Sequence, residues 1–223
     1  MTTATTMRAV CFDVGGTLIE PWPSVGHVYA EVAAQFGITG IAPDALNMQF
    51  AAAWKARRGF DYSRAAWREL VNHSFAGLWP EAPGRECFDA MYEAFATAAP
   101  WRMFDDVHPT LAAVRARGWK LGVVSNWDER LRPLLRELKL IEHFDVVVIS
   151  QEAGFTKPSP EIFQRAALEL GFLPETILHI GDSEAEDLNG ARSAGMKSLL
   201  LDRRVSRIAA ATVNTLAAVL DVG

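Results

Sequence analysis

The chain has 223 residues, of which 50% are hydrophobic and 22% are charged, so it is long enough for one domain with a large insertion. Its net charge of -5 argues against a nucleic-acid partner, because phosphate backbones attract basic surfaces. It shows no signal peptide and no apolar run of membrane-spanning length, and its two cysteines do not suggest disulfides. We therefore expect a cytoplasmic protein with no nucleic-acid or membrane partner and leave the oligomeric state open.

Short apolar runs rich in Val, Ile and Leu alternate with amphipathic segments over most of the chain. Five such runs cover residues 8–12, 120–124, 145–150, 177–180 and 197–201. One of the segments between them opens with Ser159 and Pro160, which are typical of a helix cap and a first helical position. The alternation predicts an α/β fold with a doubly wound, parallel, Rossmann-like sheet.

The interval from about residue 20 to residue 100 breaks this alternation, because it contains several helical stretches and no convincing strand. Within it, large apolar residues recur every four positions: Trp67, Val71, Phe75 and Trp79. Packing of small helices explains these aromatic residues more simply than a substrate box does. The pattern predicts an inserted α-helical cap at residues 21–99, within a core domain made of residues 1–20 and 100–223.

A carboxylate ends the first apolar run. Asp13 follows the run directly and is itself followed by Val14, two glycines and Thr17. A carboxylate at the end of a hydrophobic strand costs several kcal/mol unless a cation meets it. Asp13 is therefore a candidate nucleophile or metal ligand.

Polar groups follow four of the predicted strands directly or after a short loop: Asp13, Ser125 with Asn126, Lys157, and Asp182. The carboxyl ends of parallel strands meet at the same edge of a sheet, so these groups should converge on one crevice. Their convergence is a stronger indication of a site than any of the motifs alone.

In order and spacing these motifs resemble those of the haloacid dehalogenase (HAD) superfamily, in the branch with a helical C1-type cap between the first two motifs. The matching segments are Asp13-Val14-Gly15-Gly16-Thr17, Val123-Val124-Ser125-Asn126, Lys157-Pro158, and Gly181-Asp182-Ser183 with Asp187. Residues 118–203 are similar to haloacid dehalogenase-like hydrolase domain-containing proteins. The resemblance implies a HAD core with an inserted helical cap.

The resemblance also implies a hydrolase, in the first place a Mg²⁺-dependent phosphatase that acts on a small phosphorylated metabolite through an aspartyl-phosphate intermediate. Asp13, Lys157 and Ser125 would be catalytic, and Thr17, Ser125, Asn126 and Lys157 would bind the substrate. The Mg²⁺ ion would be held by Asp13, Asp182, Asp187 and the main-chain carbonyl of Gly15. Oxygen ligands of this kind suit Mg²⁺.

Gly15 departs from the pattern of the phosphatases in this superfamily, which place a carboxylate there to protonate the leaving group and then to activate water. A positioned acid or base contributes about 10²- to 10⁴-fold in rate. Glu20, His27, Asp128 or a water molecule are candidate substitutes, and without one of them we expect slow turnover.

Other functions stay open because of Gly15. A 2-haloacid dehalogenase needs no such acid, but that group carries an asparagine in its fourth motif, where this chain retains Asp182. A phosphonoacetaldehyde hydrolase would use a cap lysine, and Lys55 is the only lysine of the predicted cap. A catalytically weak phosphate-binding or regulatory protein on the same scaffold is the alternative from another class.

Three further residues receive structural interpretations. Ser183 and Glu186 have the spacing of a capping box at the start of a helix, although Glu186 is also a secondary candidate for the metal shell. His179 lies within a buried apolar run, where a core histidine with satisfied hydrogen bonds is the simpler interpretation.

Overall fold

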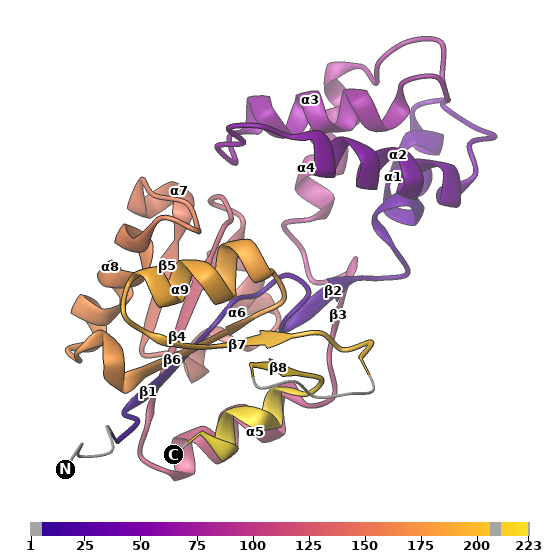
Figure 1. Cartoon of the computed structure of the whole chain (residues 1–223). Coiled ribbons are helices and arrows are strands. Elements are labelled where there is room, and N and C mark those ends of the chain that lie inside the picture. Colours follow the sequence, from indigo (N-terminus) through magenta and orange to yellow (C-terminus); the bar gives the residue numbers. More distant parts are fainter. Residues whose placement is uncertain (1–5, 206–210, 223) are drawn as a thin grey trace. The chain divides into compact units, whose positions relative to one another are not determined.

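The computed structural model describes residues 6–205 and 211–222, which divide into two compact units (Figure 1). The first unit contains residues 6–19, 103–129, 139–205 and 211–222, and the second contains residues 20–102 and 130–138. Nothing in the sequence pattern indicated that residues 130–138 group with the helices of the second unit. The domain boundaries given above stay a prediction.

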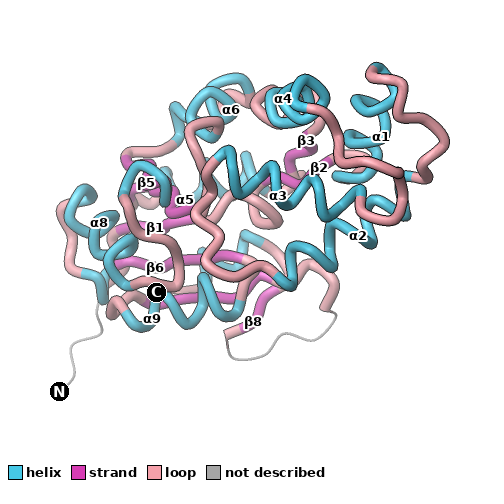
Figure 2. The backbone as a smooth tube through the Cα atoms, turned by 90° about the horizontal axis from the view of Figure 1, so that it is seen from above, coloured by secondary structure: helices cyan, strands magenta, loops and turns pink. Residues whose placement is uncertain are grey.

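A six-stranded parallel sheet forms the core of the first unit, in the order β5-β4-β1-β6-β7-β8. Its strands are β1 (Ala9–Phe12), β4 (Lys120–Ser125), β5 (Val146–Ile149), β6 (Ile177–Gly181), β7 (Lys197–Leu201) and β8 (Thr212–Val213). Figure 2 shows β5, β1, β6 and β8 in that order across the sheet. Every predicted apolar run forms a strand, which confirms the α/β fold with a parallel sheet. The two-residue strand β8 was not predicted, because no apolar run marks it.

Helices cover both faces of this sheet. Ala9 and Cys11 of β1 pack in one buried cluster with α8 (Pro160–Leu170) and α9 (Gly190–Ser193). The opposite face is covered by α5 (Val107–Ala116) and the 3₁₀ helix η4 (Leu216–Asp221) (Figure 1). Successive side chains of a strand point to opposite faces, so a strand covered on both sides must be apolar throughout. Shorter helical turns complete the unit: η1 (Ile141–His143), α7 (Ser150–Ala153), η2 (Pro174–Thr176) and η3 (Glu184–Asn189).

The order of the strands places one edge of β1 at a topological switch point. The chain runs from β1 to β4 and β5 on one side and then returns to β6 and β7 on the other side. In open parallel sheets, ligands bind outside the carboxyl ends of the strands at such a point. The residues that follow β1, β4 and β6 are therefore brought to the same place by topology alone.

Helices dominate the second unit, as predicted for the insertion: α1 (Val25–Gln35), α2 (Pro43–Ala56), α3 (Arg64–Phe75), α4 (Arg85–Ala94) and α6 (Leu131–Glu137). Its core is aromatic, and the ring of Tyr29 lies 6.2 Å from that of Phe75 and 5.9 Å from that of Phe95. Trp67 stacks on Trp54 at 5.8 Å. These contacts support the packing interpretation of the aromatic residues. Among the described residues, no helix combines the length and the apolarity needed to cross a membrane.

A two-stranded ribbon of β2 (Ile19–Pro21) and β3 (Trp101–Met103) lies at the two ends of the interval that we expected to contain no strand. Neither strand was predicted, because both are too short to show a period of two, and the elements between them are the helices α1 to α4. Glu20 of β2 forms an ion pair with Arg102 of β3. The guanidinium of Arg102 also lies 3.5 Å from the centre of the Trp22 ring.

The start of α8 confirms Pro160 as the first helical residue and corrects the role of Ser159. Ser159 occupies the cap position, but its side chain makes no hydrogen bond to the helix backbone. Its hydroxyl donates instead to the carboxylate of Glu161. The sequence pattern therefore located the beginning of the helix correctly and the hydrogen bond of its cap wrongly.

The carboxylate of Asp106 attaches the C-terminal segment to the rest of the first unit. It accepts hydrogen bonds from the Arg203 guanidinium at 2.9 and 3.0 Å, from the Thr215 hydroxyl at 2.9 Å and from the Leu216 amide at 2.9 Å. Burial opposes ionisation of this carboxyl, but these donors lower the pKa of Asp106 below its usual range.

We expect Asp106→Asn to lower the free energy of unfolding by about 1–3 kcal/mol at neutral pH, the usual contribution of hydrogen bonds to a charged group. The folded pKa is depressed, so the contribution is present above the unfolded pKa of about 3.9 and disappears as the pH falls through the folded value. Urea unfolding at pH 7, 5 and 3 should show the two proteins converging at the lowest pH. The exposed neighbour Asp105, replaced by asparagine, is the matched control.

Candidate active site

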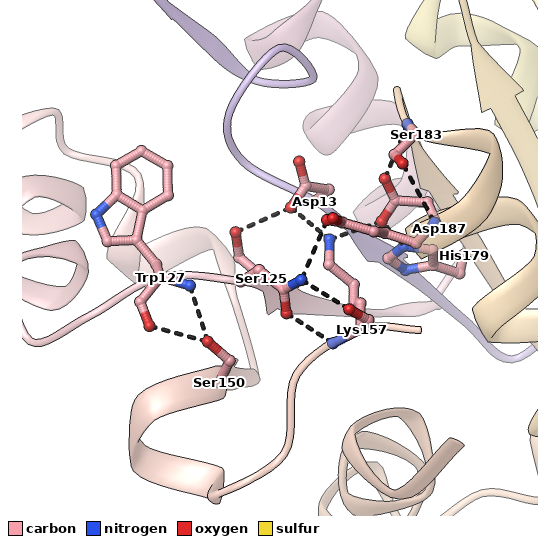
Figure 3. Close-up of polar contacts among 10 residues, drawn as sticks. Asp13, Ser125, Trp127, Ser150, Lys157, His179, Ser183 and Asp187 are labelled. Carbon is pink, nitrogen blue, oxygen red and sulfur yellow. Dashed lines mark hydrogen bonds and ion pairs between the residues drawn. The ribbon is translucent and has the colours of Figure 1, made fainter. Parts of the chain in front are cut away.

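Asp13 follows β1 directly and is the centre of a buried polar cluster (Figure 3). Its amide donates to the carbonyl of Ile180 at 3.0 Å, which fixes the residue between β1 and β6. Its Oδ1 atom accepts hydrogen bonds from Ser125 Oγ at 2.9 Å and from Lys157 Nζ at 2.6 Å. Both hydrogen bonds are made to Oδ1, so they leave Oδ2 available to react with a substrate.

Lys157 joins two carboxylates of the site. Its ammonium contacts Asp187 Oδ1 at 2.6 Å in addition to Asp13 Oδ1, and the whole side chain is buried (Figure 3). Burial alone would favour the neutral amine, but Asp13 and Asp187 raise the pKa of Lys157 above its ordinary value. Lys157 therefore supplies a fixed positive charge beside the candidate nucleophile.

Asn126 holds the backbone of Lys157 in place. Its Oδ1 accepts from the Lys157 amide at 2.7 Å, and its Nδ2 donates to the Lys157 carbonyl at 3.0 Å and to Glu186 Oε2 at 3.1 Å. Both ends of the side-chain amide are thus engaged with the protein. A direct contact between Asn126 and substrate stays a prediction, and the geometry supports a positioning role.

Asp187 lies in η3, a π-helix in which the Leu188 amide reaches back five residues to the Ser183 carbonyl at 3.1 Å. Such wide turns are frequent at functional sites. Here the turn is accompanied by two contacts of the Asp187 carboxylate, one with His179 Nε2 at 2.9 Å and one with the Ser183 amide at 3.1 Å. Burial opposes ionisation, but Lys157 and His179 lower the pKa of Asp187. Asp187 is therefore an ionised partner of Lys157.

These contacts correct two interpretations of the sequence. The Ser183 hydroxyl does accept from the Glu186 amide at 3.2 Å, as a capping box requires, but the Ser183 amide is bound by Asp187 and not by Glu186. His179 is a fully buried histidine, as predicted, but it is not fully satisfied: its Nδ1 has no hydrogen-bond partner among the described residues. His179 acts on the site through Asp187.

Asp182 follows β6 and packs closely against the loop after Asp13. Gly16 has a left-handed backbone with φ of 75°, and a Cβ atom there would lie 2.2 Å from Asp182 Oδ2. Only glycine avoids both the backbone strain and this clash. Asp182 keeps an exposed side, but the surrounding protein and the negative charges of Asp13 and Asp187 raise the pKa of Asp182 to about 7.

The three aspartates could share a divalent cation. Asp13, Asp182 and Asp187 each offer an oxygen atom, and these atoms lie within 4.8 Å of one another. Lys157 is the only lysine or arginine that contacts this set among the described residues, so three carboxylates face one permanent positive charge. This imbalance adds to the effect of burial in raising the pKa of Asp182. Donor set and charge therefore fit a divalent ion with a preference for oxygen ligands.

Thr17 lies in the same loop as Gly16 and is fully buried. Its hydroxyl has no hydrogen-bond partner among the described residues, and its carbonyl accepts from Arg203 at 2.9 Å. A buried hydroxyl without a partner is costly unless a ligand engages it. This observation is compatible with the predicted role of Thr17 as a substrate contact, which stays a prediction.

Beside Gly15, at the position of the missing acid, lies the indole of Trp127. A Cβ atom on Gly15 would lie 3.2 Å from Cζ3 of Trp127, tighter than ordinary van der Waals contact. Ser150 fixes the backbone of Trp127, because its hydroxyl is 3.0 Å from both the Trp127 amide and the Trp127 carbonyl (Figure 3). The sequence analysis missed Trp127, because a tryptophan in a turn carries no signal of its own.

The proposed substitutes for the acid differ in their surroundings. Asp128 belongs to the unit that contains Asp13 and is fully buried. Glu20 and His27 belong to the second unit, where Glu20 is paired with Arg102 and His27 Nδ1 lies 2.7 Å from Ser24 Oγ. Lys55 is exposed near the end of α2.

Comparison with known proteins agrees with this geometry. Residues 7–195 match the family of haloacid dehalogenase-like hydrolases. The chain belongs to this family. It is therefore a hydrolase with the HAD fold, as the motifs predicted.

Two similar proteins are named as a HAD-like hydrolase domain protein and as a phosphatase. The chain is 35% identical over 207 residues to mouse haloacid dehalogenase-like hydrolase domain-containing protein 3, which covers 87% of this chain and 82% of the mouse protein. It is 28% identical to the phosphoserine phosphatase of Thermus thermophilus over 88% of this chain and 89% of that one.

Solved structures share the fold of the whole chain. A HAD phosphatase from Thermococcus onnurineus has a TM-score of 0.70 and 26% identity over 96% of this chain and 97% of that one. The L-2-haloacid dehalogenase of Xanthobacter autotrophicus has a TM-score of 0.72 at 18% identity, over 96% of this chain and 97% of its own. The fold alone therefore does not choose between phosphatase and dehalogenase.

Proposed function

We propose that this HAD hydrolase is a Mg²⁺-dependent phosphatase that acts on a small phosphorylated metabolite through an aspartyl-phosphate on Asp13. One observation carries the proposal: a buried lysine joins two aspartates, while a third, Asp182, has no ion pair with a cationic side chain among the described residues. A divalent ion and a phosphoryl group are the partners that such a charge arrangement suits. The relative named as a phosphoserine phosphatase supports the same class of reaction.

In the first step, Oδ2 of Asp13 attacks phosphorus, the bond between phosphorus and the leaving oxygen breaks, and its electron pair departs with that oxygen. Lys157 and the Ser125 hydroxyl hold Asp13 through Oδ1 and so aim the other oxygen. In the second step, water attacks phosphorus, the bond to Asp13 breaks, and the carboxylate is restored. The proton of the attacking water passes to solvent or to the released phosphate.

The Asp13 carboxylate, Asp182 and the carbonyl of Gly15 are the groups that we propose to hold the metal. Both oxygens of Asp187 already accept hydrogen bonds from the protein, so Asp187 would stabilise the ion by its charge and hold Lys157 in place. When bound, Mg²⁺ would offset the negative charge of the phosphoryl group next to that of Asp13.

The alternatives fit the site less well. The superfamily's dehalogenases carry an asparagine in the fourth motif, whereas this chain has Asp182 there. The displacement of a halide does not need the additional negative charge of an aspartate. A Schiff-base mechanism requires a desolvated lysine, and Lys55 is exposed on its helix.

A panel of phosphate monoesters, 2-haloacids and phosphonoacetaldehyde, assayed with and without Mg²⁺, tests the proposal. We expect phosphate release that requires Mg²⁺ and is lost in Asp182→Asn, because this variant removes a proposed metal ligand. Lys55→Met should retain that activity. Halide release without metal would contradict the proposal, and inactivity on the whole panel with intact Mg²⁺ binding would favour a phosphate-binding protein instead.

A further inference from the structure

The side chains around Gly15 bear on which substrates the enzyme can use, and not only on how fast it turns them over. Position 15 lies two residues after the candidate nucleophile, and the atoms nearest to a Cβ atom there are Cζ3 and Cη2 of Trp127, at 3.2 and 3.9 Å. The carbon edge of an indole, a group that is neither a general acid nor a general base at ordinary pH, thus stands where a side chain of residue 15 would begin. Gly15 and Trp127 form a matched pair, because even a Cβ atom at position 15 would press on the indole and require it to shift by a few tenths of an ångström.

The backbone that carries the ring is held in place by hydrogen bonds with α7. The Ser150 hydroxyl bridges the amide and the carbonyl of Trp127, and the Gln151 amide donates to the same carbonyl at 3.2 Å. These bonds fix the backbone from which the indole projects. The space beside Gly15 is therefore occupied by a residue whose backbone is fixed, and it is not empty.

The remaining ionisable groups around Asp13 in the first unit are occupied. Lys157 is shared between Asp13 and Asp187, His179 Nε2 is bound to Asp187, and Glu186 accepts from Asn126. Asp182 faces the other two aspartates, where the proposed metal lies. Asp128, which follows Trp127 in the chain, is fully buried and has no exposed side to turn toward a leaving group. Among the described residues of the first unit, none of these groups is left to protonate a leaving oxygen on the Trp127 side.

We propose, on the basis of the phosphatase function above, that the substrates are phosphoryl compounds whose leaving group departs without a proton. Acyl phosphates, enol phosphates and phosphoric anhydrides belong to this class, because their leaving oxygens are stable as anions. Alkyl phosphates such as sugar or serine phosphates do not, because an alkoxide must be protonated as it leaves. Trp127 is then a specificity-determining residue that acts by excluding water and acid from the leaving group.

A series of aryl phosphates tests the inference with the native chain alone. Without a general acid, kcat/KM should fall by at least about 10³-fold as the pKa of the leaving phenol rises from about 4 to about 10, since a positioned acid normally supplies about 10²- to 10⁴-fold. Acetyl phosphate should be hydrolysed and glycerol phosphate should not, with Asp13→Asn as the blank for spontaneous hydrolysis. A series with no dependence on leaving-group pKa would overturn the inference.

Variants at the matched pair sharpen the result. Gly15→Asp combined with Trp127→Ala supplies an acid together with the space for it, and should raise kcat/KM for the poorest leaving groups by at least about 10-fold, a modest part of what an acid supplies. Gly15→Asp alone should not, because the ring blocks the new side chain, and Trp127→Ala alone should keep the steep dependence. Equal gains in Gly15→Asp alone would contradict the role of Trp127.

The two proposals fail in different ways. Absence of hydrolysis with every phosphoryl compound would remove the phosphatase function itself. Hydrolysis that is insensitive to the leaving group would leave the phosphatase function standing and remove only the inference. In that case, kcat/KM that becomes dependent on the leaving-group pKa in Glu20→Gln or His27→Gln would identify the residue that supplies the acid.

Discussion

Replacement of Asp13 by asparagine is expected to lower phosphatase kcat by more than about 10³-fold while the protein stays folded. The amide oxygen of asparagine can still accept from Ser125 and Lys157, but an amide is not a nucleophile toward phosphorus. Stopped assays with a good leaving group and an unfolding curve of the same sample measure both effects.

The expected stability of Asp13→Asn separates this account from simple damage to the fold. Asp13 is one of three carboxylates that face a single lysine, so removal of its charge relieves repulsion with Asp182 and Asp187. The free energy of unfolding should therefore be unchanged or higher in the absence of metal. Asp44→Asn, at an exposed aspartate of α2, is the control that should change neither quantity. Full activity in Asp13→Asn would exclude Asp13 as the nucleophile.

Lys157→Met is expected to lower both activity and stability. Its ammonium is the partner of two buried carboxylates at 2.6 Å each, and removal of one member of such a cluster leaves uncompensated buried charge. The cost of breaking a buried pair is about 3–5 kcal/mol in the free energy of unfolding. Lys55→Met makes the same chemical change at an exposed site and should leave both properties unchanged.

The pH dependence of the Lys157→Met effect has a definite sign. The folded pKa of Asp187 is lowered, so its share of the stabilisation is present above the unfolded pKa of about 3.9 and is lost as the pH falls through the folded value. The folded pKa of Lys157 is raised, so its share is complete below the unfolded pKa of about 10.4. The difference between variant and native chain should be largest between these limits. Unfolding curves at pH 3, 7 and 9 test this, and a difference that grows at pH 3 would contradict it.

The sequence contained most of what determines the fold. Apolar runs located β1, β4, β5, β6 and β7, because strands covered on both faces are apolar throughout. The meeting of the motif residues followed from the rule that the carboxyl ends of parallel strands share one edge, whereas no strand order was predicted. The missed strands, β2, β3 and β8, have two or three residues each and are defined by pairing with distant segments, which no local pattern shows.

The candidate site was predictable at the level of which residues meet. Asp13, Ser125 and Lys157 were expected together, and in the structure Asp13 contacts both of the others. Their second layer was not predictable, because it depends on side-chain direction. The bond from His179 to Asp187 arises from a π-helical turn, and the contact of Trp127 with Gly15 arises from the conformation of a loop.

The structure leads to a different interpretation of Gly15 from the one that the sequence suggests. From the sequence it is a position where an acid is missing, so Gly15→Asp alone would be expected to restore the phosphatase. In the structure it is the space that Trp127 needs, so the same substitution meets an aromatic ring at 3.2 Å. We therefore expect an acid at position 15 to act fully only when Trp127 is replaced as well.

Direct detection of the aspartyl-phosphate tests the central claim of this account. The native chain, mixed with acetyl phosphate and Mg²⁺ and quenched in acid within a turnover, should gain the mass of one phosphoryl group, located on Asp13 and released by hydroxylamine. The second step lacks the usual base at position 15, so the phosphorylated form should accumulate. A phosphoryl group on another residue, or equal labelling of Asp13→Asn, would contradict the role of Asp13 as the nucleophile.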